Sequence, residues 1–159
     1  MTIIREPDTV DVTRLRSCRI IGIDGDNGAG KSTLANELSQ RIGGSVISVD
    51  DFLLGNGDAY LSQLNMPNIS KAIEAAEEPI IVEGMLLLDV LDRIGLTPDF
   101  MIFAKCEFEG PIMYGRQRDI CDYYKRRKPA EEAQLIVTLR IKFNMHNEDA
   151  AQTPPCLSS

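Results

Sequence analysis

The residues best suited to chemistry form a glycine-rich stretch near the amino end of the chain. It fits the pattern G-x-x-x-x-G-K-[ST] at every fixed position. Glycines let such a loop fold so tightly that its amide N–H groups point at one anion. Lys31 adds a positive charge for the β- and γ-phosphates of a nucleotide, and the Ser32 hydroxyl can ligate Mg²⁺. The stretch therefore predicts a phosphate-binding loop made of Gly25, Asp26, Asn27, Gly28, Ala29, Gly30, Lys31, Ser32 and Thr33.

The segments on both sides of this loop support the same interpretation. Residues 19–24 are a short apolar run, which is typical of a buried parallel strand. After the loop, apolar residues recur at helical spacing from Leu34 to Ile42, and Gly43-Gly44 ends the predicted helix. A strand, a loop and a helix in this order place a bound anion at the positive end of the helix dipole.

Acidic residues end the next two predicted strands. The strand over 45–49 runs into Asp50-Asp51, and the following strand runs into Glu83. Because the carboxyl ends of parallel strands carry the ligand, these carboxylates should converge near the loop. We expect Asp50 to take the proton of an acceptor hydroxyl, and Glu83, Asp51 and Ser32 to hold Mg²⁺. The alternative for each carboxylate is a helix cap or a solvated turn residue.

The only basic cluster of the chain lies in its second half. We expect Arg116 and Arg118 to belong to a short Arg-rich lid, over about residues 112–128, that closes over the nucleotide. Arginine forks suit this role because they stabilise charge on a transferring phosphoryl group. The alternative is a solvated helix face on which the arginines pair with partners such as Asp119 and Asp122.

Predicted strands and helices alternate along the chain, which indicates a parallel sheet with helices on both faces. The expected fold is α/β: a three-layer P-loop NTPase fold with a sheet of four to five strands. Besides the elements above, we predict a helix over 11–17, a helix over 68–76, a strand over 79–82, a helix over 85–91 and a strand over 99–104.

Residues 135–143 fit two patterns. Apolar residues alternate with mostly polar ones, as in a strand. The preceding Pro129-Ala130-Glu131-Glu132 is a strong helix opening, and the apolar residues also satisfy helical spacing. We predict a helix.

Length, charge and cysteine content limit the domain number, the partners and the compartment of the protein. At 159 residues we expect one domain over 1–145, followed by a disordered tail over 146–159. A net charge of −7 argues against nucleic acid or an anionic membrane as a partner. The four cysteines form no C-x-x-C pair, and with a single histidine there is no zinc pattern, so scattered free thiols suggest a reducing compartment. No signal peptide or membrane span is visible, and we expect a cytoplasmic protein.

Four motifs together resemble the uridine kinases and their phosphoribulokinase and pantothenate kinase relatives. Residues 21–35 resemble the family's opening strand and loop, Val49-Asp50-Asp51-Phe52-Leu53 its second-strand motif, Val82-Glu83-Gly84-Met85-Leu86 its third-strand motif, and Arg116-Gln117-Arg118-Asp119 the start of its lid. The resemblance covers about residues 18–128.

The chain departs from this family at two places. Asp51 stands where the family usually has a small neutral residue, which leaves the choice of catalytic aspartate between Asp50 and Asp51. The family also ends with a further strand and a base-binding loop. Either residues 135–143 supply that strand, or the adenine pocket is abbreviated.

The resemblance implies an ATP- and Mg²⁺-dependent phosphotransferase that acts on a hydroxyl of a small molecule, with a nucleoside as the first choice. It implies catalytic roles for Lys31, Asp50, Arg116 and Arg118. The alternatives are an ATPase or switch without an acceptor, and a nucleoside monophosphate kinase. The acidic residue after the second strand and the Arg-rich segment favour the kinase, and the absence of arginine from residues 56–76 favours an uncharged acceptor. A homo-oligomer is left open.

Overall fold

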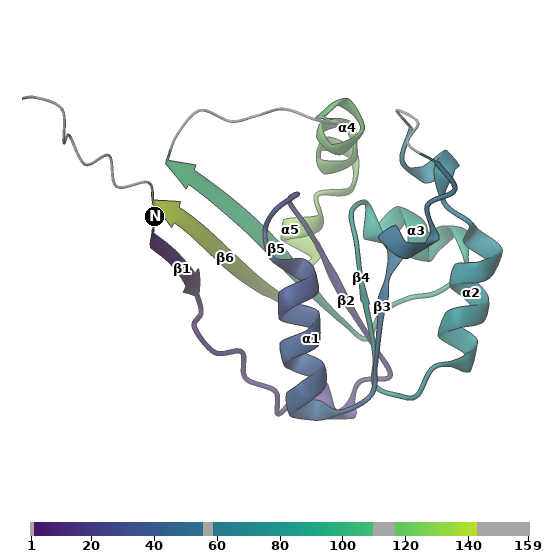
Figure 1. Ribbon diagram of the computed structural model, residues 1–159, viewed down its shortest axis with the longest axis horizontal. Coiled ribbons are helices and arrows are strands. Elements are labelled where there is room, and N and C mark those ends of the chain that lie inside the picture. Colours follow the sequence, from purple (N-terminus) through teal and green to yellow (C-terminus); the bar gives the residue numbers. More distant parts are fainter. Residues whose placement is uncertain (1, 56–58, 110–116, 143–159) are drawn as a thin grey trace, which may run out of the picture.

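The computed structural model describes residues 2–55, 59–109 and 117–142, and of residues 108, 109, 117 and 118 it describes the backbone alone. Six strands form one sheet in the order β1-β6-β5-β2-β4-β3 (Figure 1). All neighbouring strands are parallel except β1 and β6, which are antiparallel. The strands are β1 Thr2–Glu6, β2 Ile20–Gly25, β3 Ser45–Ser48, β4 Ile80–Glu83, β5 Phe100–Glu109 and β6 Leu135–Lys142.

Helices pack on both faces of this sheet. On one face, α1 buries Leu34 and Leu38 with residues of β2, β5 and β6. On the other face, α2 and α3 bury Ile69 and Leu87 with residues of β2, β3, β4 and β5. The helices are α1 Lys31–Ile42, α2 Met66–Ala75, α3 Leu87–Arg93, α4 Gln117–Arg127 and α5 Pro129–Glu132, and the 3-10 turns are η1 Leu15–Ser17, η2 Val49–Phe52 and η3 Leu61–Gln63. The expected α/β fold with three layers is confirmed.

The predicted helix over 135–143 is wrong, because these residues form strand β6. The helix opening at Pro129 is real, but α5 ends after four residues. From Leu135 onwards the backbone pairs with β5 on one side and β1 on the other, so both edges of β6 find partners. The side chains of β6 alternate between the core and the surface: Val137 is 3% exposed, whereas its neighbour Ile136 is 45% exposed.

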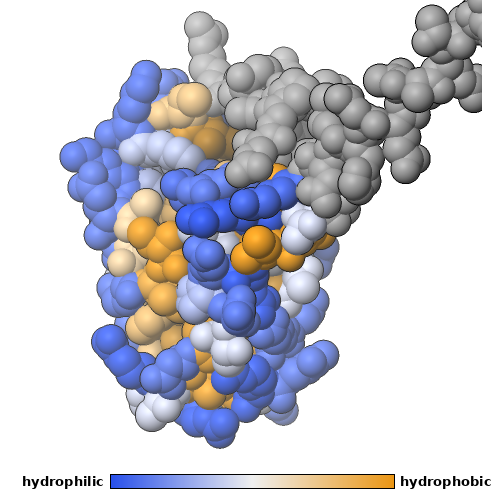
Figure 2. Space-filling view, turned by 90° about the vertical axis from the view of Figure 1, so that its left-hand side faces the viewer, coloured by the Kyte–Doolittle hydropathy of each residue, from blue (hydrophilic) through white to orange (hydrophobic). Residues whose placement is uncertain are grey.

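The sheet has one strand more than the upper end of our range because β1 gave no sequence signal that we recognised. Strand β1 lies at the edge of the sheet, and Figure 2 shows the side of the molecule that carries this edge, where hydrophobic and hydrophilic residues are mixed. Ile3 of β1 is among the exposed large hydrophobic residues. The helix predicted over 11–17 is also wrong in extent, since only the short turn η1 forms there.

The order of the strands places the loop after β2 at a topological switch point. From β2 the chain passes through α1 to β3 on one side, whereas β5, the neighbour of β2 on the other side, leads to β6. Ligands of open α/β sheets bind outside the carboxyl ends of the strands at such a point. Among the described residues, no helix is long and apolar enough to cross a membrane.

We predict that Gly44→Ala destabilises the protein much more than Gly95→Ala. Both glycines have a positive φ, 82° and 72°, so both variants carry backbone strain of about 1–2 kcal/mol. A Cβ at Gly44 would lie 1.9 Å from the carbonyl oxygen of Pro79, whereas one at Gly95 would meet nothing within 4 Å. Because backbone has to move only in the first case, Gly44→Ala should lose a further ~2 kcal/mol or more in urea unfolding. Equal losses of stability in the two variants would contradict the close contact between Gly44 and Pro79, which directly precede β3 and β4.

Candidate functional site

The glycine-rich loop joins the end of β2 to the start of α1 and rests on β5. At Gly25, φ is 142°, and a Cβ would lie 2.0 Å from the carbonyl oxygen of Ala104. The N–H of Asp26 donates to that same oxygen at 2.9 Å. Gly30, with φ of 75°, precedes α1 and has no side chain with which to cap it. Since no side-chain cap occupies the first turn of α1, its N–H groups can bind an anion.

The ammonium group of Lys31 lies inside this loop. Its Nζ donates to the carbonyl oxygens of Gly25 at 3.1 Å and Asp26 at 2.7 Å. Burial lowers the pKa of Lys31, and nearby carboxylates, the largest effect coming from Glu83, oppose that shift. The loop therefore holds a positive charge that can exchange backbone carbonyls for phosphate oxygens.

A hydroxyl and a carboxylate meet beside the first turn of α1. The Oγ of Ser32 donates to Oε1 of Glu83 at 2.8 Å, and Glu83 is 3% exposed at the end of β4. Parallel pairing of β2 and β4, with Ile23 opposite Glu83, brings this carboxylate to the loop. In the described residues no group of three or more His, Cys, Asp or Glu could hold a metal ion. The pair suits Mg²⁺, which binds to one or two protein ligands and completes its shell with water and phosphates.

The two neighbouring aspartates of η2 differ in their surroundings. Oδ1 of Asp50 accepts a hydrogen bond from the phenol of Tyr60 at 2.5 Å, and its charge acts on Lys31. Tyr60 is 1% exposed, its oxygen accepts the N–H of Met85, and burial raises its pKa. The side chain of Asp51 is exposed, and no hydrogen bond or ion pair joins it to another residue in the described parts of the chain. The structure thus brings Asp50 toward the loop and does not join Asp51 to Ser32 and Glu83, while the roles of both aspartates stay predictions.

Asp24 is a buried carboxylate directly before the loop. It is fully buried, and it accepts hydrogen bonds from the N–H of Gly25 at 2.8 Å, the N–H of Leu87 and the phenol of Tyr123. Burial raises the pKa of Asp24 to about 6, although these donors work against the shift. The folded state therefore holds this proton more tightly than the unfolded chain, so this group makes stability fall as the pH rises from about 4 to about 6.

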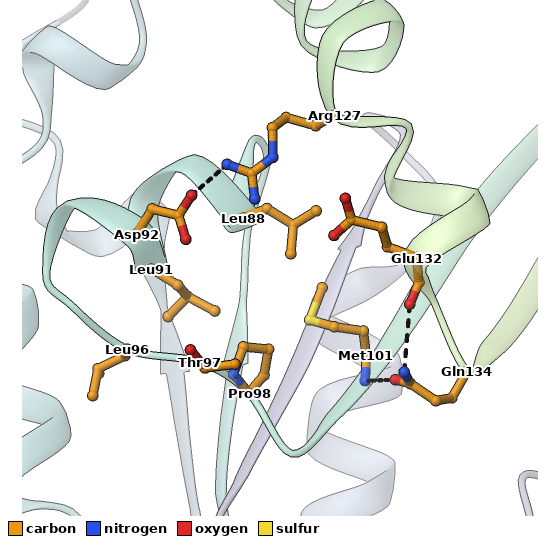
Figure 3. Close-up of a pocket in the computed structure, with 10 residues that line it drawn as sticks. All are labelled: Leu88, Leu91, Asp92, Leu96, Thr97, Pro98, Met101, Arg127, Glu132 and Gln134. Atoms are coloured by element: carbon orange, nitrogen blue, oxygen red, sulfur yellow. Dashed lines mark hydrogen bonds and ion pairs between the residues drawn. The ribbon is translucent and has the colours of Figure 1, made fainter.

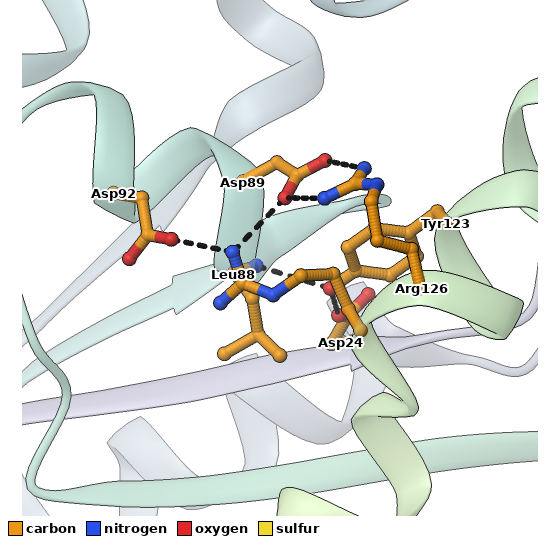
Figure 4. A network of polar contacts seen from close by, with 7 residues as sticks. Asp24, Leu88, Asp89, Asp92, Tyr123 and Arg126 are labelled. Carbon is orange, nitrogen blue, oxygen red and sulfur yellow. Dashed lines mark hydrogen bonds and ion pairs between the residues drawn. The ribbon is translucent and has the colours of Figure 1, made fainter.

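The predicted lid is described only in part. Arg116 lies outside the described residues, and so does the side chain of Arg118. Farther along α4, Arg126 binds Asp89 of α3 through two hydrogen bonds of 3.0 and 2.5 Å (Figure 4). Arg127 binds Asp89 at 3.1 Å. Burial acts to raise the pKa of Asp89, but the guanidinium groups outweigh it and the pKa is lowered. These two arginines hold α4 on α3.

Sequence reasoning missed three hydroxyl donors of the site, Tyr60, Tyr123 and Tyr124. Tyr123 and Tyr124 donate to Asp24 and Asp26, which precede them by 99 and 98 residues. No local spacing signals such a contact. The two tyrosines could be linked to the loop only through the position of α4 at the carboxyl end of the sheet. That position is known only once the fold is known.

Two of the hollows that border α4 have volumes of about 200 Å³ or more. One of about 200 Å³, lined by Leu88, Met101 and Arg127 among others, lies toward the amino end of β5 (Figure 3). Because the loop is at the carboxyl end of the neighbouring β2, this hollow is separate from it. The other, of about 290 Å³, lies between α4, the start of α3 and the segment around η3. Its lining includes Ala59, which precedes Tyr60 in the chain.

The chain resembles several solved structures to different degrees. A possible uridine kinase from Bacillus stearothermophilus is similar over 74% of this chain and 86% of its own, with 18% identity and a TM-score of 0.52. Thymidylate kinase from Candida albicans has 18% identity, coverage of 77% and 84%, and a TM-score of 0.49. Shikimate kinase from Bacteroides thetaiotaomicron has 14% identity, coverage of 76% and 86%, and a TM-score of 0.46. No protein-family model and no curated protein matches the chain.

At 18% identity the likeness to the possible uridine kinase concerns the fold alone. The chain has the three-layer α/β fold of that structure.

Proposed function

We propose that the protein is an ATP-dependent phosphotransferase that moves the γ-phosphate of ATP to a hydroxyl of a small molecule, with a nucleoside as the first choice. One observation carries this proposal. An uncapped helix N-terminus, the ammonium of Lys31, the Ser32–Glu83 pair and the Asp50 carboxylate gather at one edge of the sheet. Phosphoryl transfer needs these parts: donors for the phosphates, magnesium ligands and a group that positions the acceptor.

Lys31 and the first turn of α1 bind the phosphates in this account. The ammonium turns from the carbonyls of Gly25 and Asp26 to the β- and γ-phosphates, while the free N–H groups of the loop donate to the same anion. Ser32 and Glu83 hold Mg²⁺, which neutralises charge on the phosphates when it is bound. Arg116 and Arg118 are proposed on sequence grounds to add positive charge at the transferring group.

Asp50 is the proposed base. Its Oδ1 is fixed by Tyr60, and Tyr60 is fixed in turn by the N–H of Met85. The second oxygen, Oδ2, is left to accept the hydrogen of an acceptor hydroxyl and to take the proton as the bond to phosphorus forms. A carboxylate that is fixed beside the loop can position the hydroxyl of an acceptor. This favours a kinase over an ATPase or switch, which has no acceptor.

The hollow of about 290 Å³ beside η3 is the proposed acceptor site. Ser62, Arg93, Asp119 and Asp122 are among the polar residues that line it. Asp119 and Asp122 can accept hydrogen bonds from the hydroxyl groups of a ligand, while Arg93 and Arg126, which also line the hollow, balance their charge. These acceptors support an alcohol such as a nucleoside, and the preference for an uncharged one rests on the sequence.

We also propose a cytoplasmic location. Cys18, Cys106 and Cys121, the cysteines in the described part of the chain, are free thiols. Free thiols suit a reducing compartment.

An acceptor panel tests the proposed activity directly. The protein is incubated with Mg²⁺ and labelled ATP, alone and with nucleosides, sugars and pantothenate. A kinase forms ADP at a rate that depends on one acceptor and transfers the label to it. Release of labelled inorganic phosphate at the same rate with every acceptor would indicate an ATPase instead.

We predict that Lys31→Met abolishes ATP binding and transfer without unfolding the protein. The methionine stem keeps the packing of the buried lysine but removes the charge for the phosphates, so turnover should fall at least about 100-fold. Lys71→Met is the matched control, because Lys71 is exposed on α2 and belongs to neither the loop nor the predicted lid. Turnover that is equal in the two variants would contradict the loop assignment.

We predict that Asp50→Asn lowers transfer about 100-fold or more while ATP affinity is retained. The amide keeps the size of the side chain and can still bond Tyr60, but it cannot take a proton. Asp51→Asn, one residue away and exposed, should have a much smaller effect. Steady-state kinetics and equilibrium ATP binding measure both variants. If Asp51→Asn is the more damaging change, the catalytic aspartate is Asp51.

A further inference from the structure

Two consecutive tyrosines of α4 bond to two aspartates on either side of Gly25. The phenol of Tyr123 donates to Oδ2 of Asp24, and the phenol of Tyr124 donates to Oδ1 of Asp26 at 2.6 Å. The two rings lie side by side, with centroids 5.9 Å apart. Figure 4 shows Tyr123 reaching from α4 between Leu88 and Asp24. One helix therefore contacts both residues at the entry of the phosphate loop.

Each aspartate also accepts a hydrogen bond from a backbone N–H. The other oxygen of Asp24 accepts the N–H of Gly25 at 2.8 Å. The other oxygen of Asp26 accepts the N–H of Cys106 in β5 at 2.8 Å. A phenol, a carboxylate and a backbone N–H thus form two chains of hydrogen bonds, one of which ends at the N–H of Gly25 and the other at the N–H of Cys106 in β5.

The carbonyls that hold Lys31 belong to the peptide groups directly after Gly25 and Asp26. Its ammonium binds the oxygens of Gly25 and Asp26, and in the proposed function it must leave them when phosphates bind. The entry of the loop then loses a charged donor. The two chains of hydrogen bonds that begin at Tyr123 and Tyr124 then continue to hold the entry of the loop. The bond from the N–H of Asp26 to the carbonyl of Ala104 also remains.

Helix α4 is itself fixed at its far end. Arg126 and Arg127 bind Asp89 of α3, and the oxygen of Tyr123 accepts the N–H of Leu88 in α3 at 3.1 Å. The tyrosines therefore extend from a supported helix and can resist displacement of the loop.

We propose that Tyr124 and Tyr123 are positioning residues for the phosphate loop, which set its affinity for nucleotide phosphates by holding Asp26 and Asp24 against α4. This inference rests on the proposed function in that the loop must bind phosphates. It goes beyond that function by assigning the shape of the loop to a helix remote from it in sequence.

Tyr124→Phe is the main test. It removes one hydroxyl and keeps the ring, which packs edge-on against Phe103 with centroids 5.6 Å apart. A hydrogen bond to a charged group is lost, so binding of ATP and of inorganic tripolyphosphate should weaken about tenfold or more in titration calorimetry. Tyr123→Phe also leaves the N–H of Leu88 without its phenol acceptor and serves as the second variant.

The control is Gly43→Ala, at the end of α1 that is remote from the loop, where a φ of 80° strains an alanine but a Cβ would meet nothing within 4 Å. It should lower the melting temperature and leave the binding of ATP and tripolyphosphate unchanged. A double-mutant cycle adds a second readout: if Tyr124 acts through Asp26, Tyr124→Phe causes no further loss of affinity in an Asp26→Ala background.

Each result decides the proposal. Weaker phosphate binding in Tyr124→Phe, normal binding in Gly43→Ala and a non-additive cycle support it. Wild-type affinity in Tyr124→Phe, or equal weakening in Gly43→Ala, overturns it while the proposed function stands. If the wild-type protein binds neither ATP nor tripolyphosphate, the proposed function fails, and the positioning role fails with it.

Discussion

The site depends on a single ammonium group surrounded by carboxylates. Lys31 lies within the field of Glu83, Asp24, Asp50 and Asp26, which come from β4, β2, η2 and the loop itself. Each of these four carboxylates accepts a hydrogen bond from a hydroxyl group, supplied by Ser32, Tyr123, Tyr60 and Tyr124 respectively. Hydroxyl donors stabilise the charged form of a carboxylate without adding a competing cation. The four carboxylates therefore need no cation other than Lys31, and the ammonium of Lys31 can bind a phosphate.

This arrangement explains which part of the site the sequence could predict. The phosphate loop, Glu83 and the paired aspartates follow strands directly, so a local pattern was enough to place them at one edge of a parallel sheet. The choice of Asp50 over Asp51 gains support only from Tyr60, ten residues away across a 3-10 turn. The tyrosines of α4 could not be assigned, because their partners are fixed by the docking of α4 and not by spacing.

The fold divides in the same way. Elements with strong local signals, such as β2, α1 and β4, lie close to their predicted positions. Strand β6 was mistaken for a helix because the opening at Pro129 is a genuine helix start, and only the backbones of β5 and β1 decide that Leu135 continues as a strand. Strand β1 depends on β6 for all of its pairing. Tertiary pairing overrode local propensity at this end of the sheet.

A crystal structure with a non-hydrolysable ATP analogue and Mg²⁺ is the most direct test of the central claim, that the loop exchanges its own carbonyls for phosphates at Lys31. The account predicts that Nζ of Lys31 moves from Gly25 and Asp26 to the β- and γ-phosphates. It also predicts that the bonds from Tyr123 to Asp24 and from Tyr124 to Asp26 are kept. Phosphates bound elsewhere on the protein, or a Lys31 that stays on its carbonyls with the analogue in place, would contradict it.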